Sequence, residues 1–213
     1  MQSNVKCKII SLNVRGIRDQ TKRRSIFTYL KDHKADFYFS PRDVFRWKWW
    51  INVAKWIGGG GERGGKILFS HGKRHSKGVC ILFDPTVNSN VECFFSNNTG
   101  RIDLISTYLN GVKTSVCNIY APNNQSDQLE FIQELNNCIV DKSEMTNIII
   151  GGDWNCTLTK KDKKGGAFWK PTPVRNLLLT IVETFDLIDI YRTRHPNLQL
   201  FSYEYKSLQV KSK

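Results

Sequence analysis

The most informative segment is a predicted strand, Asn147-Ile148-Ile149-Ile150-Gly151-Gly152-Asp153-Trp154-Asn155, in which an apolar run ends in two glycines, an acid and an amide. A strand buried on both faces reads as a continuous β-branched run, and polar groups at its carboxyl end lie where α/β proteins bind ligands. We therefore predict that Asp153 and Asn155 belong to a functional site. The alternative is structural: Asp153 would cap the next turn, and Asn155 would tolerate an unusual backbone angle.

Two further predicted strands, over about 5–14 and over 112–120, end in the same way. Each leaves polar side chains where the strand meets a loop, and these side chains belong to Asn13 and Arg15 in the first strand and to Asn118 and Tyr120 in the second. Three strand ends with similar chemistry indicate that they converge on one site.

Together, Ser-Leu-Asn-Val-Arg-Gly at 11–16, Asn-Ile-Tyr-Ala-Pro at 118–122 and Gly-Asp-Trp-Asn at 152–155 resemble the endonuclease/exonuclease/phosphatase superfamily. The closest likeness is to the apurinic-type endonuclease domain of non-LTR retrotransposons. The resemblance implies an α/β fold in which two mixed β-sheets pack face to face and are flanked by helices, as a four-layer sandwich. It also implies Mg²⁺-dependent (or Mn²⁺-dependent) hydrolysis of DNA phosphodiesters.

The resemblance also implies roles for individual residues. Asp153 would be the general base or would orient the attacking water, Asn155 would hold Asp153 and the phosphate, and Tyr120 would donate to a phosphate oxygen. Asn13 and Asp153 would hold the metal ion, and substrate binding would fall on Asn13, Arg15 and Asn118. Without the resemblance, Tyr120 is more typical of a core ring with a satisfied hydroxyl, and Asn13 of a turn residue.

One departure from the family lies after the predicted short strand 36–39. The family carries Leu-Gln-Glu-Thr there, with the glutamate as the main metal ligand, whereas a straight alignment places Arg42 at that position. Asp43 is one residue away and would point to the opposite face of a strand. Magnesium binding and turnover are therefore expected to be reduced or lost.

Residues 39–45 can be encoded by codons that give Phe-Leu-Gln-Glu-Thr-Tyr-Ser in another reading frame. We therefore predict that about 40–63 is an aberrant insert, produced wholly or partly by a frameshift. The rival interpretation of this Trp-rich and Lys-rich segment is an aromatic and basic patch that stacks on nucleic acid.

A second departure is at the carboxyl end, where we expect the last strands of the family fold and its terminal catalytic histidine to be missing. His195 precedes Pro196 and is expected to be a surface turn residue. Two alternatives to an active nuclease follow from these departures: a non-catalytic nucleic-acid-binding domain, and a decayed fragment that folds poorly.

The composition fits one domain over 1–213 with a polyanionic partner. The chain has 213 residues, 40% of them apolar, and a formal net charge of +13 with a pI near 9.6. The alternative is a solubilising surface charge, but the basic residues gather at 22–24, 73–77 and 160–164, which favours a nucleic-acid partner. No apolar run has membrane-spanning length, so we expect no membrane partner. We also expect a monomer with no small-molecule cofactor beyond the metal.

The six cysteines show no Cys-x-x-Cys pair and no zinc-ligand spacing with the four histidines. They are expected to be mostly buried, reduced thiols of an intracellular protein, and a DNA substrate would favour the nucleus.

The local signals predict further elements. Helices are expected over 20–33, from a capping box of Asp127 and Glu130 to about Val140, and after Thr172-Pro173. Asn110-Gly111 predicts a tight hairpin between the strands 101–108 and 112–120, and further strands are expected over 78–83 and 91–95.

Overall fold

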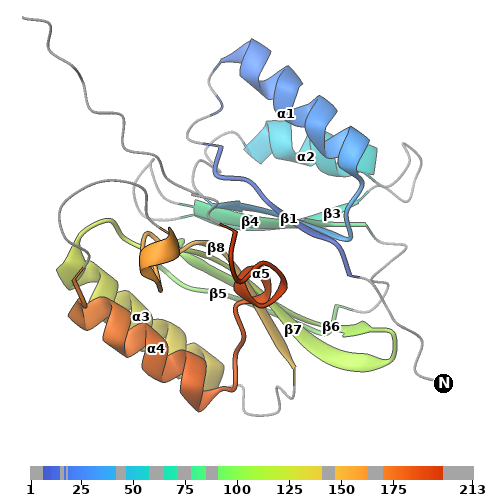
Figure 1. Ribbon diagram of the computed structural model, residues 1–213. Coiled ribbons are helices and arrows are strands. Elements are labelled where there is room, and N and C mark those ends of the chain that lie inside the picture. Colours follow the sequence, from blue (N-terminus) through green and yellow to red (C-terminus); the bar gives the residue numbers. More distant parts are fainter. Residues whose placement is uncertain are drawn as a thin grey trace, which may run out of the picture. The chain divides into compact units, whose positions relative to one another are not determined.

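The computed structural model describes residues 7–14, 17, 19–41, 47–57, 65–71, 78–84, 91–140, 147–162 and 170–198 (Figure 1). Its internal contacts divide the chain into two compact units. The first comprises 1–121 and 138–154, and the second comprises 122–137 and 155–213. The single-domain boundary over 1–213 stays a prediction.

The first unit contains two four-stranded mixed sheets. One has the order β1 (Ile9–Ser11), β2 (Phe37–Pro41), β4 (Gly78–Phe83), β3 (Lys66–His71), with β1 and β2 parallel and the other pairs antiparallel. The other has the order β5 (Cys93–Ser96), β6 (Ile102–Leu109), β7 (Val112–Tyr120), β8 (Ile148–Asp153), with only β7 and β8 parallel.

The inner faces of the two sheets form one apolar core. Alternate side chains of β2 and β4 point to the second sheet, and this core is made of Phe37, Phe39, Ile81, Phe83, Ile105 and Val116. A Cβ on Gly151 would approach the ring of Phe39 to 2.7 Å, so β8 comes close to β2 only because that side chain is missing. The predicted α/β class with two mixed sheets packed face to face and helices beside them is confirmed.

The opposite face of the first sheet is covered by α1 (Gln20–His33) and α2 (Trp47–Ile57), as Figure 1 shows. The predicted helix over 20–33 is confirmed, and Asp19 caps it by accepting a hydrogen bond from the backbone N–H of Lys22 at 2.7 Å. The core beneath the helices contains, among others, Leu30, Tyr38, Trp50, Val53 and Leu82.

Part of the predicted aberrant insert is therefore a packed helix. Trp50, Val53 and Ala54 of α2 are at most 2% exposed and pack in one core cluster with Leu30 of α1 and Leu82 of the first sheet. The reading frame of the coding DNA stays a prediction, and Arg42 and Asp43 lie outside the described residues.

Two predicted boundaries were wrong. Within the described residues 7–14, the first strand covers only Ile9–Ser11, where the whole of about 5–14 was expected; among the described strands it pairs with β2. The helix α3 (Gln125–Val140) begins before Asp127: Asn124 caps it, accepting from the backbone N–H of Asp127 at 2.8 Å and donating to its carboxylate at 2.9 Å. The same reciprocal pattern was expected three residues later.

The second unit contains most of α3, a 3₁₀ turn (Lys160–Asp162), α4 (Pro173–Thr184) and α5 (Ile190–Arg194). The predicted start of α4 is confirmed, since the Thr172 hydroxyl accepts from the backbone N–H of Arg175 at 3.2 Å. His195 is exposed at the end of α5, as expected of a turn residue. Among the described helices, none combines the length and apolar character that a bilayer crossing needs.

Candidate active site

Asp153 is the last residue of β8, and the parallel register places it beside Tyr120, the last residue of β7. The backbone N–H of Ala121 donates to the carbonyl oxygen of Asp153 at 2.8 Å, which extends the pairing beyond the strand ends. The Asp153 side chain is half-buried. Two of the predicted site residues, Tyr120 and Asp153, therefore lie side by side at the carboxyl ends of β7 and β8.

Asn13 joins these strand ends from the other sheet of the same unit. It comes two residues after the end of β1. Between them, the Leu12 N–H donates to the Phe39 carbonyl at 2.9 Å, which extends the pairing of β1 with β2 by one residue. The Nδ2 group of Asn13 donates directly to Oδ2 of Asp153, across 140 positions of sequence. The structure thus brings Asn13 and Asp153 together, as the strand-end pattern indicated.

Tyr120 is only 6% exposed, and Arg101 holds it. Arg101 Nη1 donates to the Tyr120 carbonyl oxygen at 2.9 Å, and the guanidinium lies 5.2 Å from the centre of the ring. This is a cation–π contact, in which the guanidinium of Arg101 is attracted to the face of the Tyr120 ring. The degree of burial suits a core ring, which was the structural alternative for Tyr120.

Sequence reasoning missed Arg101, although a signal was present. The turn Asn110-Gly111 has positive φ at both residues, and it pairs Leu109 with Val112. Counting back along both strands from that turn places Arg101 opposite Tyr120. The hairpin alone could therefore have predicted this cation beside the site.

Asn118 lies inside the protein, between the two sheets. It is 0% exposed, and its Nδ2 donates to the carbonyl oxygen of Cys80 in β4 at 2.7 Å. It pairs in register with buried Asp103, whose carboxyl pKa is raised well above its usual range by burial. Asn118 exposes no surface to a ligand and is placed to support β7; its predicted substrate contact stays a prediction.

Asn155 belongs to the second unit and has a positive φ of 45°. Its backbone carbonyl accepts a hydrogen bond of 2.9 Å from Gln128 Nε2, which also donates to the Pro122 carbonyl at 2.8 Å. The left-handed backbone is what the structural alternative for Asn155 expected. Its catalytic role stays a prediction.

Comparison with solved structures decides the fold. An AP endonuclease from Archaeoglobus fulgidus matches with a TM-score of 0.68 and 20% identity, over 97% of this chain and 80% of that one. A 3′ phosphatase, NExo, from Neisseria, solved with product DNA, matches with a TM-score of 0.69 and 16% identity over the same shares. The chain has the endonuclease/exonuclease/phosphatase fold.

The sequence comparison adds a mobile-element relative. A 149 kDa protein of the transposon TX1 from Xenopus laevis is 27% identical over 139 residues, which is 65% of this chain. The matched region spans only 10% of that relative's length. No family model matches the sequence.

The described residues of this endonuclease/exonuclease/phosphatase fold offer a small oxygen-donor set for a metal. Asp153 supplies a carboxylate and Asn13 an amide oxygen; in the described ranges no three His, Cys, Asp or Glu side chains form a possible metal cluster. Magnesium keeps several waters and commonly takes one or two carboxylates, so this pair fits a weakly held ion. Arg15 and Arg42 lie outside the described residues, although β2 ends at Pro41, directly before Arg42.

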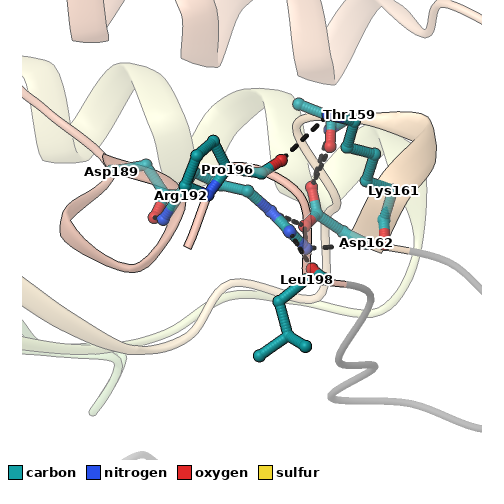
Figure 2. A network of polar contacts seen from close by, with 7 residues as sticks. All are labelled: Thr159, Lys161, Asp162, Asp189, Arg192, Pro196 and Leu198. Atoms are coloured by element: carbon teal, nitrogen blue, oxygen red, sulfur yellow. Dashed lines mark hydrogen bonds and ion pairs between the residues drawn. The ribbon is translucent and has the colours of Figure 1, made fainter. Parts of the chain in front are cut away.

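The loop that follows the candidate site is fixed within the second unit by a polar network, shown in Figure 2. Thr159 donates its backbone N–H and its hydroxyl to Oδ2 of Asp162, at 2.9 and 2.6 Å. Nε and Nη2 of Arg192 both donate to Oδ1, and Arg192 Nη1 reaches the Leu198 carbonyl. Burial would raise the pKa of Asp162, but the hydrogen bonds from Thr159 and Arg192 outweigh it and lower that pKa.

We expect Arg192→Ala to lower the free energy of unfolding by about 2 kcal/mol at pH 7, because a partly buried carboxylate loses its charged partner. A lowered folded-state pKa stabilises the fold above the unfolded value of about 3.9, and this contribution is lost as pH falls through the folded value. The difference from the wild type should therefore shrink in acid. Urea unfolding at neutral pH and at pH below about 3 measures both effects.

Arg194→Ala is the matched control, since Arg194 is exposed in the same short helix. Its effect should stay within about 0.5 kcal/mol. Equal losses for Arg192→Ala and Arg194→Ala would show that the network in Figure 2 does not stabilise the unit.

Proposed function

We propose that the chain is a magnesium-dependent phosphodiesterase that cuts DNA, of the retrotransposon endonuclease type. The pairing of Asn13 with Asp153 at the ends of β1 and β8 is the observation that carries this proposal. The transposon relative and the DNA-processing enzymes with the same fold support DNA as the substrate. The net charge of +13 supports a polyanionic partner as well.

Asp153 would act on water. Its carboxylate accepts a hydrogen bond from Asn13, which fixes the plane of the carboxyl group. A fixed carboxylate can orient an attacking water and accept its proton as the water attacks phosphorus. Bound magnesium would supply charge neutralisation on the phosphate oxygens, with Asn13 and Asp153 as the protein ligands.

Tyr120 would contact the phosphate at the same strand ends, and Arg101 would hold Tyr120 in position. Arg101 anchors the Tyr120 backbone and lies over the ring, so the tyrosine cannot easily change its rotamer. A tyrosine held in this way can donate to a developing oxyanion without reorganisation. Arg101 would therefore be a positioning residue, because it acts through Tyr120.

We propose that turnover is slow compared with related nucleases. A straight alignment leaves Arg42 where the family has its main metal carboxylate, and Asp153 is the only carboxylate that we assign to the ion. A site with fewer anionic ligands holds magnesium less tightly. Activity should therefore rise with magnesium concentration over a wide range instead of saturating early.

Nicking of supercoiled plasmid by the purified chain tests this function. We expect slow nicking that increases with added magnesium and stops when a chelator is added. If the chain binds DNA and melts cooperatively but nicks no plasmid at any magnesium concentration, hydrolysis is excluded.

A non-catalytic nucleic-acid-binding domain is the second candidate. The small donor set of the described site favours it, because Asn13 and Asp153 give one carboxylate between them. Its signature would be DNA binding that weakens steeply with salt and is unaffected by the loss of Asp153. A broad melt without cooperativity would instead indicate a decayed fragment.

A further inference from the structure

A groove lies between the two helices that cover the first sheet. Its volume is about 290 Å³, and Gln20, Arg23, Arg24, Phe27 and Trp49 line it. The first four follow the spacing i, i+3, i+4, i+7, so they share one face of α1, and Trp49 comes from α2. We call it the α1–α2 groove.

The apolar wall of the groove is anchored in the core. Phe27 and Trp49 are partly buried and pack against the cluster of side chains under the helices. The Trp49 ring meets the fully buried Trp50 ring edge-on, with 4.7 Å between centroids and an angle of 68°. Two aromatic faces are therefore held in place before any ligand arrives.

The polar side of the groove is cationic. Arg23 is held by a hydrogen bond of 2.9 Å from its Nη1 to the Ile17 carbonyl, whereas Arg24 is exposed. Gln20 adds an amide, and none of the five lining side chains is an acid. Rings beside guanidinium groups suit a ligand that combines a flat aromatic part with a phosphate.

We propose that the α1–α2 groove binds one unpaired nucleotide of single-stranded nucleic acid. The base would stack on Trp49, and the phosphate would lie on Arg23 and Arg24. The volume is at the small end of ligand pockets, which suits one nucleotide better than a duplex. This site is separate from the proposed hydrolysis and needs no metal.

The α1–α2 groove is close in sequence to the candidate active site. Gln20 follows Asn13 by seven residues, and seven residues span at most about 25 Å. A strand held at Asp153 could therefore continue to the groove. An enzyme that unpairs its DNA target would gain affinity by holding the unpaired base in the α1–α2 groove.

The test measures binding of the full chain to a fluorescent oligothymidine by anisotropy, with chelator present so that hydrolysis cannot interfere. We expect Trp49→Ala to weaken binding about tenfold and Trp49→Phe to weaken it less, because stacking on an aromatic ring is what the site supplies. On a strand of the same length whose sugars carry no bases, wild type and Trp49→Ala should bind alike.

Arg24→Ala tests the phosphate contact, and Arg194→Ala is its charge-matched control on the second unit. We expect the first to reduce affinity severalfold more than the second. Melting temperatures of all variants identify any that fail to fold, and Trp49→Phe preserves the helix if Trp49→Ala does not. Equal loss for both arginine variants, or a Trp49→Ala effect that persists on the base-free strand, would overturn the proposal.

Discussion

Replacement of Asp153 by asparagine is expected to slow plasmid nicking at least about 100-fold while the protein stays folded. The asparagine keeps an oxygen that can accept the hydrogen bond from Asn13, so the geometry at the ends of β1 and β8 survives. It removes the negative charge that would bind magnesium and take a proton from water. Initial rates of nicking at one fixed, high magnesium concentration measure the effect, and melting curves show whether the variant is folded.

Asp32→Asn is the matched control for this substitution. Asp32 is an exposed residue of α1, and the change removes the same charge with the same atoms. Its nicking rate should equal that of the wild type. If Asp153→Asn nicks as fast as Asp32→Asn, Asp153 has no part in hydrolysis.

Gly152→Ala is expected to destabilise the protein by at least about 3 kcal/mol, which is the largest loss of stability that we predict. Gly152 has a φ of +126°, and a Cβ there would come within 2.1 Å of the Ile119 carbonyl oxygen and 2.9 Å of Asn118 Oδ1. The backbone oxygen cannot move without breaking the pairing of β7 with β8. Denaturant unfolding of the purified variant gives the free energy, and failure to obtain folded protein would agree with it.

Gly111→Ala separates the steric clash from the backbone strain. Gly111 also has a positive φ, +79°, but a Cβ there would meet nothing within 4 Å. The loss should therefore be only about 1 kcal/mol, the cost of a left-handed non-glycine residue. Equal losses at the two positions would mean that the close approach of β8 to β7 does not exist in solution.

The sequence predicted the second sheet and the start of α4 well, because each has a clear local signal. The Asn110-Gly111 turn and the apolar run before Gly151 specify the backbone of the sheet, and Thr172 followed by proline specifies the start of the helix. The strand-end pattern also predicted that Asn13 and Asp153 would meet. The two residues come from different sheets, since Asn13 follows β1 and Asp153 ends β8, so it is the packing of the two sheets that brings them together.

Other features depend on contacts that no local signal records. Asn118 looked like a strand-end polar group, but its neighbours in β4 and β6 bury it completely. The segment containing Trp50 looked foreign to the fold, yet an apolar helix face can be buried by any sheet that lacks a cover. The network of Asp162 and Arg192 joins residues 30 positions apart and could not be foreseen from either segment.

The most direct test of the account is a double-mutant cycle on plasmid nicking with wild type, Asn13→Ala, Asp153→Asn and the double variant. If Asn13 and Asp153 form one hydrolytic site, Asn13→Ala slows nicking at least about tenfold, and the double variant is no slower than Asp153→Asn alone. Independent losses that multiply in the double variant, or an Asn13→Ala rate equal to the wild type, would contradict it.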